Sequence, residues 1–451
     1  MDSMKTIAYA LPCRILFTAL VLLAAAGSLA AAEPAPRKQP ANGKLKIFIL
    51  SGQSNMVGFG TVASAPNATT PTPGTMDACV KGKPKEFGHL IDKAGKPVVR
   101  DDVWIVDLSY ADKQRSGWLT TGYGASEGHI GPEYAFGFVV GDYYEDPVLL
   151  IKSAWGGRSL SVNFLPPSAE QYPKPTKDGD KGFQYAEVLR HVKEITGDLK
   201  KHFPGYAGKG YEIVGFGWHQ GWNDRINQQA VDAYESNLVH FIKDLRKDLG
   251  VVNMPFVVAN TGIGGWDIPE KAPYKARVEK HMAAQLAPTD AVKYPQFVGN
   301  VAGVETRDFM RKSEESPSKQ EFHWNRNWET YYLIGKSMGE SMVTMLAGIG
   351  GRPARDQFKG MQLYSWKDEK DQWTYALLPG RNDEWTAAQV MEAGNQLRGV
   401  NEVKAGFARL APGETISWHH RNAAFAYPPP AIRAEIVRCA QELQVKLTIS
   451  N

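Results

Sequence analysis

The sequence has few cysteines and almost no excess of charge of either sign. Only three of its 451 residues are Cys, so neither a disulfide-rich scaffold nor a cysteine-ligated zinc site is indicated. The 52 Lys and Arg residues nearly balance the 48 Asp and Glu residues, which leaves no basic surface for nucleic acid. Hydrophobic residues make up 43% of the chain. This is enough for a large core and excludes a disordered protein, a collagen-like fibre and a polytopic membrane protein.

A membrane-spanning run is also lacking at the N-terminus. Residues 15–26 are apolar, follow a basic segment and precede the small residues 30–32, but the run is shorter than the ~20 residues that a spanning helix needs. This pattern is typical of a cleaved signal peptide, with an uncleaved anchor as the alternative. We therefore expect a signal peptide at 1–32, a linker at 33–43, a secreted or periplasmic protein, and no other membrane association.

Two cysteines, Cys79 and Cys439, remain after that cleavage. They are remote in sequence, and a chain of this size does not need a disulfide for stability. Two free thiols are the favoured expectation, with one disulfide as the alternative.

Short apolar, β-branched runs alternate with helical patterns along most of the chain. The clearest helical pattern covers residues 230–249, where apolar residues recur three and four positions apart. Such alternation predicts an α/β fold with a mostly parallel sheet. The expected strands cover residues 44–50, 103–108, 147–153, 212–218, 255–260 and 296–301.

Two changes of composition divide the chain further. Residues 61–100 are rich in Pro, Gly, Thr and Lys and predict a long surface insertion. A Gly- and Pro-rich stretch at 348–353 follows a helix expected at about 328–346. It separates a main domain at 44–350 from a small α+β module at 356–451, whose function the sequence does not indicate. Within the module we expect a strand at 373–378, helices at 387–395 and 431–444, and a strand at 445–449.

A serine follows the first expected strand at a sharp turn. The segment SGQSNM, residues 51–56, comes directly after the strand, and its glycine allows a turn that presents Ser54 at the start of a helix. Ligands of open α/β sheets bind at the carboxyl ends of the strands, and a helix N-terminus favours a developing negative charge. Ser54 is therefore a candidate nucleophile, with an ordinary helix N-cap as the alternative.

Two further segments follow expected strands and contain hydrogen-bond donors. The segment SAWGGR, residues 153–158, has paired glycines, which either turn an N–H toward an oxyanion or form a plain tight turn. The segment WHQGWND, residues 218–224, supplies the side-chain amides of Gln220 and Asn223. We interpret His219, flanked by Trp218, as a packing or orienting residue.

A serine nucleophile needs a general base, and His323 has a suitable position. It lies in the polar segment EFHWN directly before the helix expected at 328–346, 323 − 54 = 269 residues after Ser54. Separation along the chain is no obstacle, because a base need only be close in the fold. There is no HExxH motif, Cys/His cluster or Asp-rich loop, so we expect no metal and no cofactor.

These blocks, in this order, resemble the SGNH-hydrolase superfamily. Within it they are similar to the sialate O-acetylesterase and acetylxylan-esterase-like branch, whose nucleophile motif is GQSN(M). The resemblance covers about residues 44–346. It implies a three-layer, flavodoxin-like α/β fold and hydrolysis of an acetyl ester on a carbohydrate, so the expected partner is an O-acetylated sugar or polysaccharide.

The resemblance also implies roles for particular residues. It makes Ser54 the nucleophile and His323 the base. The oxyanion hole would consist of the backbone N–H groups of Ser54 and Gly157 and one amide side chain. Gln220 is the favoured amide, with Asn223 as the alternative.

Two positions depart from the pattern of the family. The branch often has Glu after HQG, where this chain has Trp222, and the superfamily usually has Asp three residues before the His, where this chain has Gln320. Glu321 and Asp224 are the candidates for a replacement acid. The alternative is that a backbone carbonyl or Gln320 orients the His, which leaves a Ser-His dyad.

Tryptophans are frequent in and beside these segments and suggest a second hypothesis. Aromatic rings offer flat apolar faces, so Trp155, Trp222 and Trp324 are candidates for stacking on a sugar. The alternative to a serine carbohydrate esterase is then a non-catalytic carbohydrate-binding protein on an esterase fold. A lipase-like or peptidase hydrolase is a third possibility, although the insertion at 61–100 is too polar for a lipase lid.

Overall fold

The computed structural model describes most of the chain from residue 43 onward. The predicted signal peptide at 1–32, residues 33–42 of the predicted linker, the predicted domain boundary and the predicted helix at 387–395 lie outside the described residues. The described ranges are 43–203, 210–262, 264–290, 292–348, 361–368, 371–379, 396–408, 415–419, 429–443 and 446–449.

A seven-stranded sheet organises the larger part of the chain, with the strand order β4-β3-β6-β1-β7-β8-β9. All neighbouring strands are parallel except the edge strand β4, which is antiparallel to β3. The predicted α/β fold with a mostly parallel sheet is therefore confirmed. The strands are β1 (Leu45–Gly52), β3 (Arg100–Asp107), β4 (Arg115–Leu119), β6 (Val148–Ala154), β7 (Tyr211–His219), β8 (Phe256–Ala259) and β9 (Val301–Val304).

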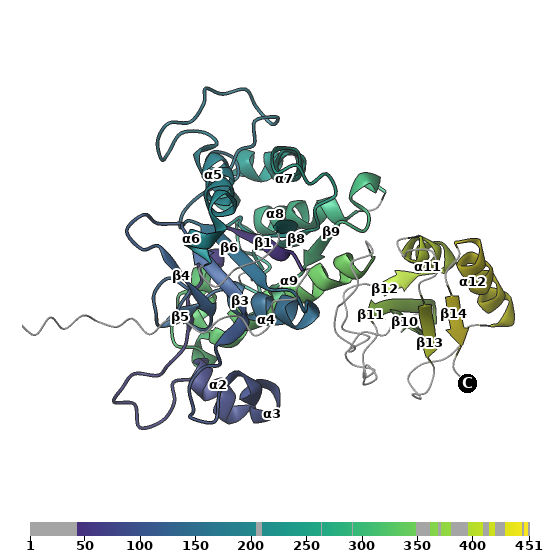
Figure 1. The fold of residues 1–451 in the computed structure, drawn as a ribbon, viewed down its shortest axis with the longest axis horizontal. Helices are drawn as coiled ribbons and strands as arrows, with labels where there is room; N and C mark the ends of the chain where they lie inside the picture. The colour runs from purple at the N-terminus through teal and green to yellow at the C-terminus, as the bar shows by residue number, and fades with distance from the viewer. Residues whose placement is uncertain are drawn as a thin grey trace, which may run out of the picture. The chain divides into compact units, whose positions relative to one another are not determined.

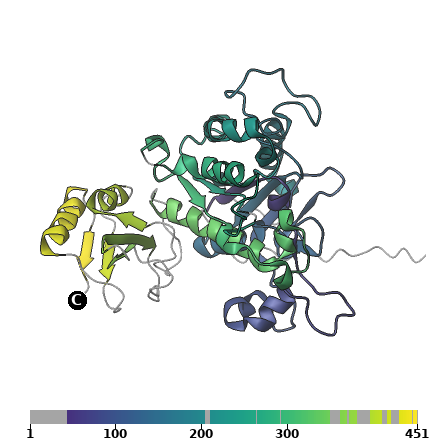
Figure 2. The same cartoon turned by 180° about the vertical axis from the view of Figure 1, so that it is seen from behind.

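Helices cover both faces of this sheet and make it the middle of three layers (Figures 1 and 2). Alternate residues of β1 serve the two faces: Phe48 and Leu50 pack toward α4 and α9, and Ile47 and Ile49 pack toward α5 and α7. Burial on both faces explains why the strands have continuous apolar sequences. The helices are α4 (Glu133–Tyr143) and α9 (Trp328–Gly348) on one face, and α5 (Phe183–Gly197), α7 (Gln228–Asp248) and α8 (Lys275–Leu286) on the other.

The last strand begins later than predicted. Residues 295–297 form a short 3₁₀ turn that begins at Pro295, and β9 then covers Val301–Val304. Proline lacks the N–H that a central ladder requires, so the apolar residues around Phe297 belong to the turn.

Two short helices follow strands or helices of this part of the chain: α1 (Ser54–Val57) comes after β1, and α6 (Leu199–His202) comes after α5.

The region 61–100 is only in part the surface insertion that its composition predicts. It contains α2 (Met76–Gly82) and α3 (Pro84–Phe87), while β2 (Gly60–Thr61) pairs with β5 (His129–Ile130) at its start. Four of its side chains lie in the same core cluster as α4 and α9, and the ring of Phe87 contacts two aromatic rings of α9 edge-on. The prediction is therefore wrong for residues 76–90. The buried side chains are Met76, Cys79, Phe87 and Leu90.

A second, five-stranded sheet follows in the C-terminal part of the chain. Its order is β12-β11-β10-β13-β14, with antiparallel pairs on one side of β10 and parallel pairs on the other. The predicted small C-terminal module therefore exists, and its boundaries stay a prediction. Its elements are β10 (Met361–Lys367), β11 (Trp373–Pro379), β12 (Gln396–Arg398), α11 (Val400–Phe407), β13 (Thr415–His419), α12 (Pro430–Glu442) and β14 (Lys446–Ile449).

Two further observations concern the thiols and the membrane. Cys79 and Cys439 are both free and both buried, in agreement with the favoured expectation. Burial raises the pKa of the Cys79 thiol to about 12. Within the described ranges, no helix combines the length and apolar character needed to cross a membrane.

Candidate active site

The strands β1, β6 and β7 end side by side, which brings three of the predicted segments together. Gly52 at the end of β1 is in register with Ala154 of β6 and His219 of β7. Hydrogen bonds continue past the sheet, from Gln53 N to His219 O (3.2 Å) and from Trp155 N to Gly52 O (3.1 Å). A Cβ on Gly52 would lie 2.1 Å from His219 O, so glycine is required for this close approach. Ser54, the paired glycines 156 and 157 and the segment at 218–224 therefore come at or directly after the ends of three adjacent strands, at one edge of the sheet.

Ser54 is the first residue of α1, after an extended Gln53. Its side chain is partly exposed, whereas the neighbouring Gln53 and Asn55 are buried. The helix has only four residues, so the helix-dipole contribution expected from the sequence is small. The turn after β1, rather than the field of a long helix, gives Ser54 its position.

Gly157 and Asn223 lie together beside this edge and present hydrogen-bond donors. Asn223 Nδ2 donates to Gly157 O (2.7 Å), which leaves its second amide hydrogen unused. Gly157 is exposed, has a left-handed φ of 68°, and has nothing within 4 Å of where a Cβ would lie. No described residue accepts a hydrogen bond from the N–H of Ser54 or of Gly157. Gly156 differs, since its N–H donates to the hydroxyl of Tyr110 (2.9 Å).

Gln220, the favoured oxyanion amide in the sequence-based interpretation, does not have a free donor. Its side chain is 1% exposed, and its Nε2 donates to Asp224 Oδ2 (2.7 Å), Arg158 O (2.9 Å) and Gln53 Oε1 (3.2 Å). An amide with all its hydrogens engaged in the protein cannot also stabilise an oxyanion. The geometry therefore favours Asn223, the alternative, over Gln220.

Asp224 is also occupied within the protein and is not positioned as the third member of a triad. Its buried carboxylate accepts hydrogen bonds from Leu160 N (2.8 Å), Ser161 N (2.9 Å) and Gln220 Nε2. Burial raises its pKa. These bonds attach the third segment to the chain that follows Gly157, so the role of Asp224 is structural. In the part of the chain that the structure describes, no three His, Cys, Asp or Glu side chains are grouped to hold a metal ion.

Gln53 is a residue of this site that the sequence-based reasoning did not identify. Its side chain is 2% exposed, and its Oε1 accepts hydrogen bonds from Gly221 N (3.0 Å) and Asn223 N (3.2 Å). The residue before Ser54 therefore holds the backbone of the third segment in place. The sequence could have pointed to Gln53, because it stands in the GQSN motif directly before the candidate nucleophile. A polar side chain that is buried at such a position needs a hydrogen-bond partner.

His323 is connected to the serine segment through Asn55. Asn55 Nδ2 donates to Phe322 O (3.2 Å). The hydroxyl of Tyr331 lies within hydrogen-bond distance of both Asn55 Oδ1 (2.8 Å) and His323 O (3.3 Å). The residue after the serine thus binds the residue before the histidine, although the two are 267 positions apart. Asn55 is a second residue of the candidate site that the sequence-based reasoning missed.

The imidazole of His323 is half-buried between two phenylalanine rings. It stacks on Phe59 with the ring centroids 3.9 Å apart and an angle of 9° between the planes, and it lies 4.4 Å from the tilted ring of Phe322. Burial, and next the charge of Arg326, lower its pKa to about 4. His323 is therefore neutral at pH 7.

None of the candidate partners is bonded to the imidazole of His323. Its Nδ1 is buried and has no hydrogen-bond partner among the described residues. Glu321 is exposed. The side-chain oxygen of Gln320 accepts a hydrogen bond from Arg326 Nε (2.8 Å), and its carbonyl accepts the backbone N–H of His323 (2.7 Å) rather than the ring. The arrangement is that of a histidine without a carboxylate partner.

Two of the three predicted stacking tryptophans are core residues. Trp324 is 0% exposed and Trp155 is 7% exposed, so neither presents a face to a sugar, and these two predictions are wrong. Trp222 is partly exposed. The guanidinium of Arg225 lies 3.4 Å from the centre of its ring, and the exposed ring of Phe322 lies 6.0 Å away.

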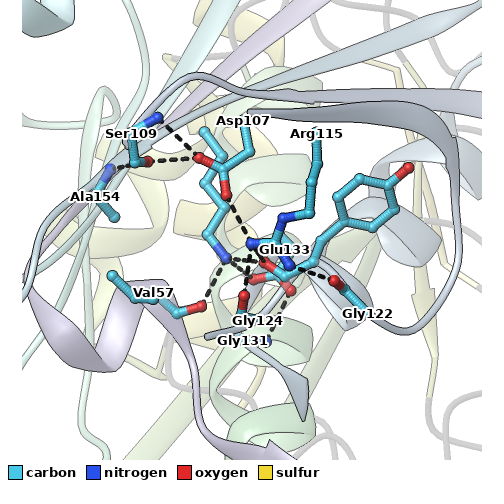
Figure 3. A network of polar contacts seen from close by, with 11 residues as sticks. Val57, Asp107, Ser109, Arg115, Gly122, Gly124, Gly131, Glu133 and Ala154 are labelled. Carbon is cyan, nitrogen blue, oxygen red and sulfur yellow. Dashed lines mark hydrogen bonds and ion pairs between the residues drawn. The ribbon is translucent and has the colours of Figure 1, made fainter. Parts of the chain in front are cut away.

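A buried ion pair is connected to the end of the short helix that begins with Ser54, and Figure 3 shows the network around it. Lys152 of β6 and Glu133 of α4 are each 1% exposed, with Nζ and Oε2 2.8 Å apart. Lys152 Nζ also donates to Val57 O (2.8 Å) at the end of α1 and to Tyr123 O (2.6 Å), and Glu133 Oε1 accepts Gly131 N (2.7 Å). The pair therefore connects the sheet, α4 and the short helix that begins with Ser54.

A second part of the same network lies beside the end of β6. Asp107 Oδ1 accepts the hydroxyl of Ser109 (2.6 Å), whose Oγ in turn accepts the N–H of Ala154 (2.9 Å). Arg115 joins Asp107 (3.1 Å) to the carbonyl of Gly124 (2.6 Å). Figure 3 shows these contacts around the ion pair.

The mostly parallel sheet between two layers of helices places the protein in the α/β class. The family model described as carbohydrate esterase, sialic acid-specific acetylesterase, matches residues 44–315, and the chain belongs to this family. The protein is accordingly a carboxylic ester hydrolase that acts on O-acetylated carbohydrate. The matched range contains Ser54, Gly157 and Asn223 and ends before His323. A search of curated protein sequences found no match.

Three solved structures are similar to this chain at low sequence identity. A protein from Arabidopsis thaliana is 19% identical, with 67% of this chain and 99% of that chain covered and a TM-score of 0.40. XAC1771, a carbohydrate acetylesterase from Xanthomonas citri, is 13% identical, with 73% and 62% covered and a TM-score of 0.39. NanS is 10% identical, with 63% and 86% covered and a TM-score of 0.36.

Proposed function

We propose that the protein removes O-acetyl groups by acyl transfer through Ser54, with His323 as the general base. The observation that supports this proposal is that the serine segment is hydrogen-bonded to the segment of His323 at the edge of the sheet where the donors of Gly157 and Asn223 lie; no hydrogen bond joins the Ser54 hydroxyl to the His323 ring among the described residues. Ser54 is partly exposed there, Gly157 and Asn223 present unused donors beside it, and Asn55 holds the segment of His323. A nucleophile, a base and oxyanion donors are the parts that acyl transfer requires.

The mechanism follows from these positions. Neutral His323 takes the proton of the Ser54 hydroxyl, and the Ser54 oxygen attacks the acetyl carbonyl carbon. The carbonyl oxygen, now negative, is stabilised by the N–H groups of Ser54 and Gly157 and by Asn223 Nδ2. The bond from the carbonyl carbon to the sugar oxygen then breaks, and His323 gives its proton to that oxygen, which leaves as a hydroxyl. Water repeats the sequence on the acetyl-enzyme to release acetate. No carboxylate contacts His323 among the described residues, so the proposal is a Ser-His dyad.

Asn223→Ala is expected to lower kcat for acetate release about 10²- to 10³-fold, with a smaller effect on KM, because an oxyanion donor acts mainly in the transition state. Steady-state kinetics on an acetylated sugar measures this. Asn223→Asp is the matched variant: it keeps the size of the side chain but removes its N–H donors, so it should be no more active than the alanine variant. Wild-type kcat in Asn223→Ala would remove Asn223 from the oxyanion hole.

We further propose that the sugar carries a carboxylate, as sialic acid does, rather than being a neutral xylose unit. Arg225 supports this. Its guanidinium forms no salt bridge within 4 Å with a described residue, and its Nε is buried without a partner. Burial lowers its pKa, and the charge of Glu321 opposes this only in part. A desolvated cation is stabilised by an anion, and guanidinium and carboxylate match each other in geometry. Arg225 stacks on Trp222, next to the amide of Asn223.

Arg225→Gln is expected to raise KM for O-acetyl sialic acid about 10- to 100-fold, since a charge-assisted hydrogen bond contributes about 1.5–3 kcal/mol. KM for acetylated xylo-oligosaccharide should stay as in the wild type. Acetate release from both substrates measures this, with Arg190→Gln on α5 as the control, since Arg190 pairs with Glu187 and Glu194. An equal rise in KM for both substrates would contradict the carboxylate proposal. Binding without acetate release from any ester would favour the non-catalytic alternative.

The location of the protein is a proposal that rests on sequence alone. We propose that residues 1–32 are removed on export and that the protein acts in the periplasm or outside the cell. An apolar run after a basic segment and before small residues supports this. N-terminal sequencing of the exported protein tests it, since a chain that still begins at Met1 would contradict cleavage.

A further inference from the structure

The imidazole of His323 lacks the partner that normally orients a catalytic histidine. In a triad, a carboxylate bonded to Nδ1 fixes the tautomer and the orientation of the ring. Here Nδ1 is buried without a partner among the described residues, and the carboxylate of Asp224 is occupied elsewhere. The ring contact that takes the place of such a bond is the parallel stack on Phe59.

Phe59 comes from the same segment as the nucleophile. It lies five residues after Ser54, between Gly58 and Gly60, and packs against the core cluster of α4 and α9. Gly58 has a φ of 93°, and a Cβ there would lie 2.1 Å from Gly131 Cα, so the backbone before Phe59 is closely packed. On its other side the ring of Phe59 meets His129 edge-on (6.0 Å). The position of the Phe59 ring is therefore fixed from several directions.

The backbone after His323 is strained, which indicates that its surroundings hold it in place. Trp324, Asn325 and Arg326 have φ angles of 51°, 52° and 57°, in the left-handed region that costs a non-glycine residue about 1–2 kcal/mol. The segment is retained by the full burial of Trp324 and by a hydrogen bond from Asn325 Nδ2 to Arg311 O (3.0 Å). This anchors the backbone of His323, so the plane of its ring depends on the rings that it contacts: Phe59, which is parallel to it, and Phe322, which is tilted.

We propose that Phe59 is the positioning residue of His323 and replaces the carboxylate of a triad by stacking. This inference rests on the proposed function, in which His323 is the base. The aromatic face restricts rotation of the imidazole and excludes water from one side of it. One short segment then supplies the nucleophile at Ser54, the link to the histidine backbone at Asn55 and the orientation of the histidine ring at Phe59.

Phe59→Leu is expected to lower kcat about 10- to 100-fold with little change in KM, because misplacement of a catalytic group by ~1 Å costs up to about 10²-fold. Phe59→Tyr retains a flat ring and should restore most of the activity. Phe309→Leu is the matched control, since Phe309 is also partly buried against the same core cluster. Glu321→Gln should leave kcat at the wild-type level. Equal losses in the Leu and Tyr variants, or wild-type kcat in Phe59→Leu, would overturn the proposal.

A second readout does not depend on catalysis. The pKa of His323, about 4 in the wild type, should rise toward 6.5 in Phe59→Leu, because removal of the stacked ring exposes the imidazole to water. In a separate kinetic measurement, the pKa on the acidic side of the pH profile of kcat/KM should rise as well. The charged and titratable groups nearby are Arg326 and Glu321 on the same segment, Tyr331, whose hydroxyl lies 3.3 Å from His323 O, and His129, which contacts Phe59. NMR titration of the imidazole, assigned with His323→Gln, measures the shift.

The two readouts separate failure of this inference from failure of the proposed function. If the pKa of His323 does not change in Phe59→Leu, the stack does not control the imidazole, and the inference is overturned even though activity still requires Ser54. If Ser54→Ala retains full activity, the proposed function fails, whatever the NMR titration gives.

Discussion

Ser54→Ala is expected to lower kcat for acetate release roughly 10⁴- to 10⁶-fold, because removal of the nucleophile leaves only the contribution of binding and the oxyanion donors. Folding should not change. The hydroxyl of Ser54 makes no hydrogen bond with another described residue, and its side chain is partly exposed. The large kinetic loss should therefore come with an unchanged thermal midpoint, and both are measured on the same preparation.

The control for this variant is Ser337→Ala, a partly buried serine on α9. It should retain wild-type kcat and a similar thermal midpoint. Acetate release by Ser54→Ala within ten-fold of the wild type would show that the ester is cleaved by another route. A fall in the thermal midpoint of Ser54→Ala would instead point to a structural role for the hydroxyl that its exposed position does not indicate.

Lys152→Met is expected to reduce the free energy of unfolding by about 3–5 kcal/mol, because it leaves the carboxylate of Glu133 buried without its cation. It also removes the donor to the carbonyls of Val57 and Tyr123. A urea titration measures the loss. The double variant Lys152→Met with Glu133→Gln should be more stable than the sum of the single losses predicts, because a neutral amide is less costly to bury than an unpaired carboxylate.

The matched control is Lys336→Met, which removes an exposed lysine paired with Glu340 one turn away on α9. Exposed pairs at this spacing contribute about 0.3–0.5 kcal/mol, so its urea midpoint should hardly move. If the two lysine substitutions lowered the free energy of unfolding equally, burial of the Lys152–Glu133 pair would add nothing to its contribution to stability. Because Val57 ends the helix that begins at Ser54, a kinetic loss in Lys152→Met at temperatures where it remains folded is also expected.

The sequence was sufficient to predict the sheet where burial is complete on both faces. β1 and β6 are buried along almost their whole length and β7 along its C-terminal half, and the ends of all three were predicted to within a few residues. The sequence did not predict the elements that are short or polar. The edge strand β4 (Arg115–Leu119) was not predicted, because it pairs on one side only and its residues are partly polar. Likewise, the few apolar residues of α2 and α3 are separated by lysines and prolines, which hid their burial.

The site was predictable as a set of segments but not as a set of side-chain roles. The nucleophile and oxyanion segments follow adjacent strand ends, so parallel topology alone places them together. Which of Gln220 and Asn223 has a free amide depends on hydrogen bonds to residues far away in sequence, such as Arg158 and Gln53. Burial of Trp324 depends in the same way on how its segment folds back. The amino-acid composition of a segment reveals neither the hydrogen-bond partners of a side chain nor its burial in the fold.

The central claim is that Ser54 is the nucleophile, and covalent labelling tests it most directly. A fluorophosphonate reagent reacts with an activated serine, and intact-mass and peptide measurements locate the adduct. The account predicts one adduct per chain, on the peptide that contains Ser54, and none in Ser54→Ala. An adduct on another residue, or active enzyme that takes up no label, would contradict it.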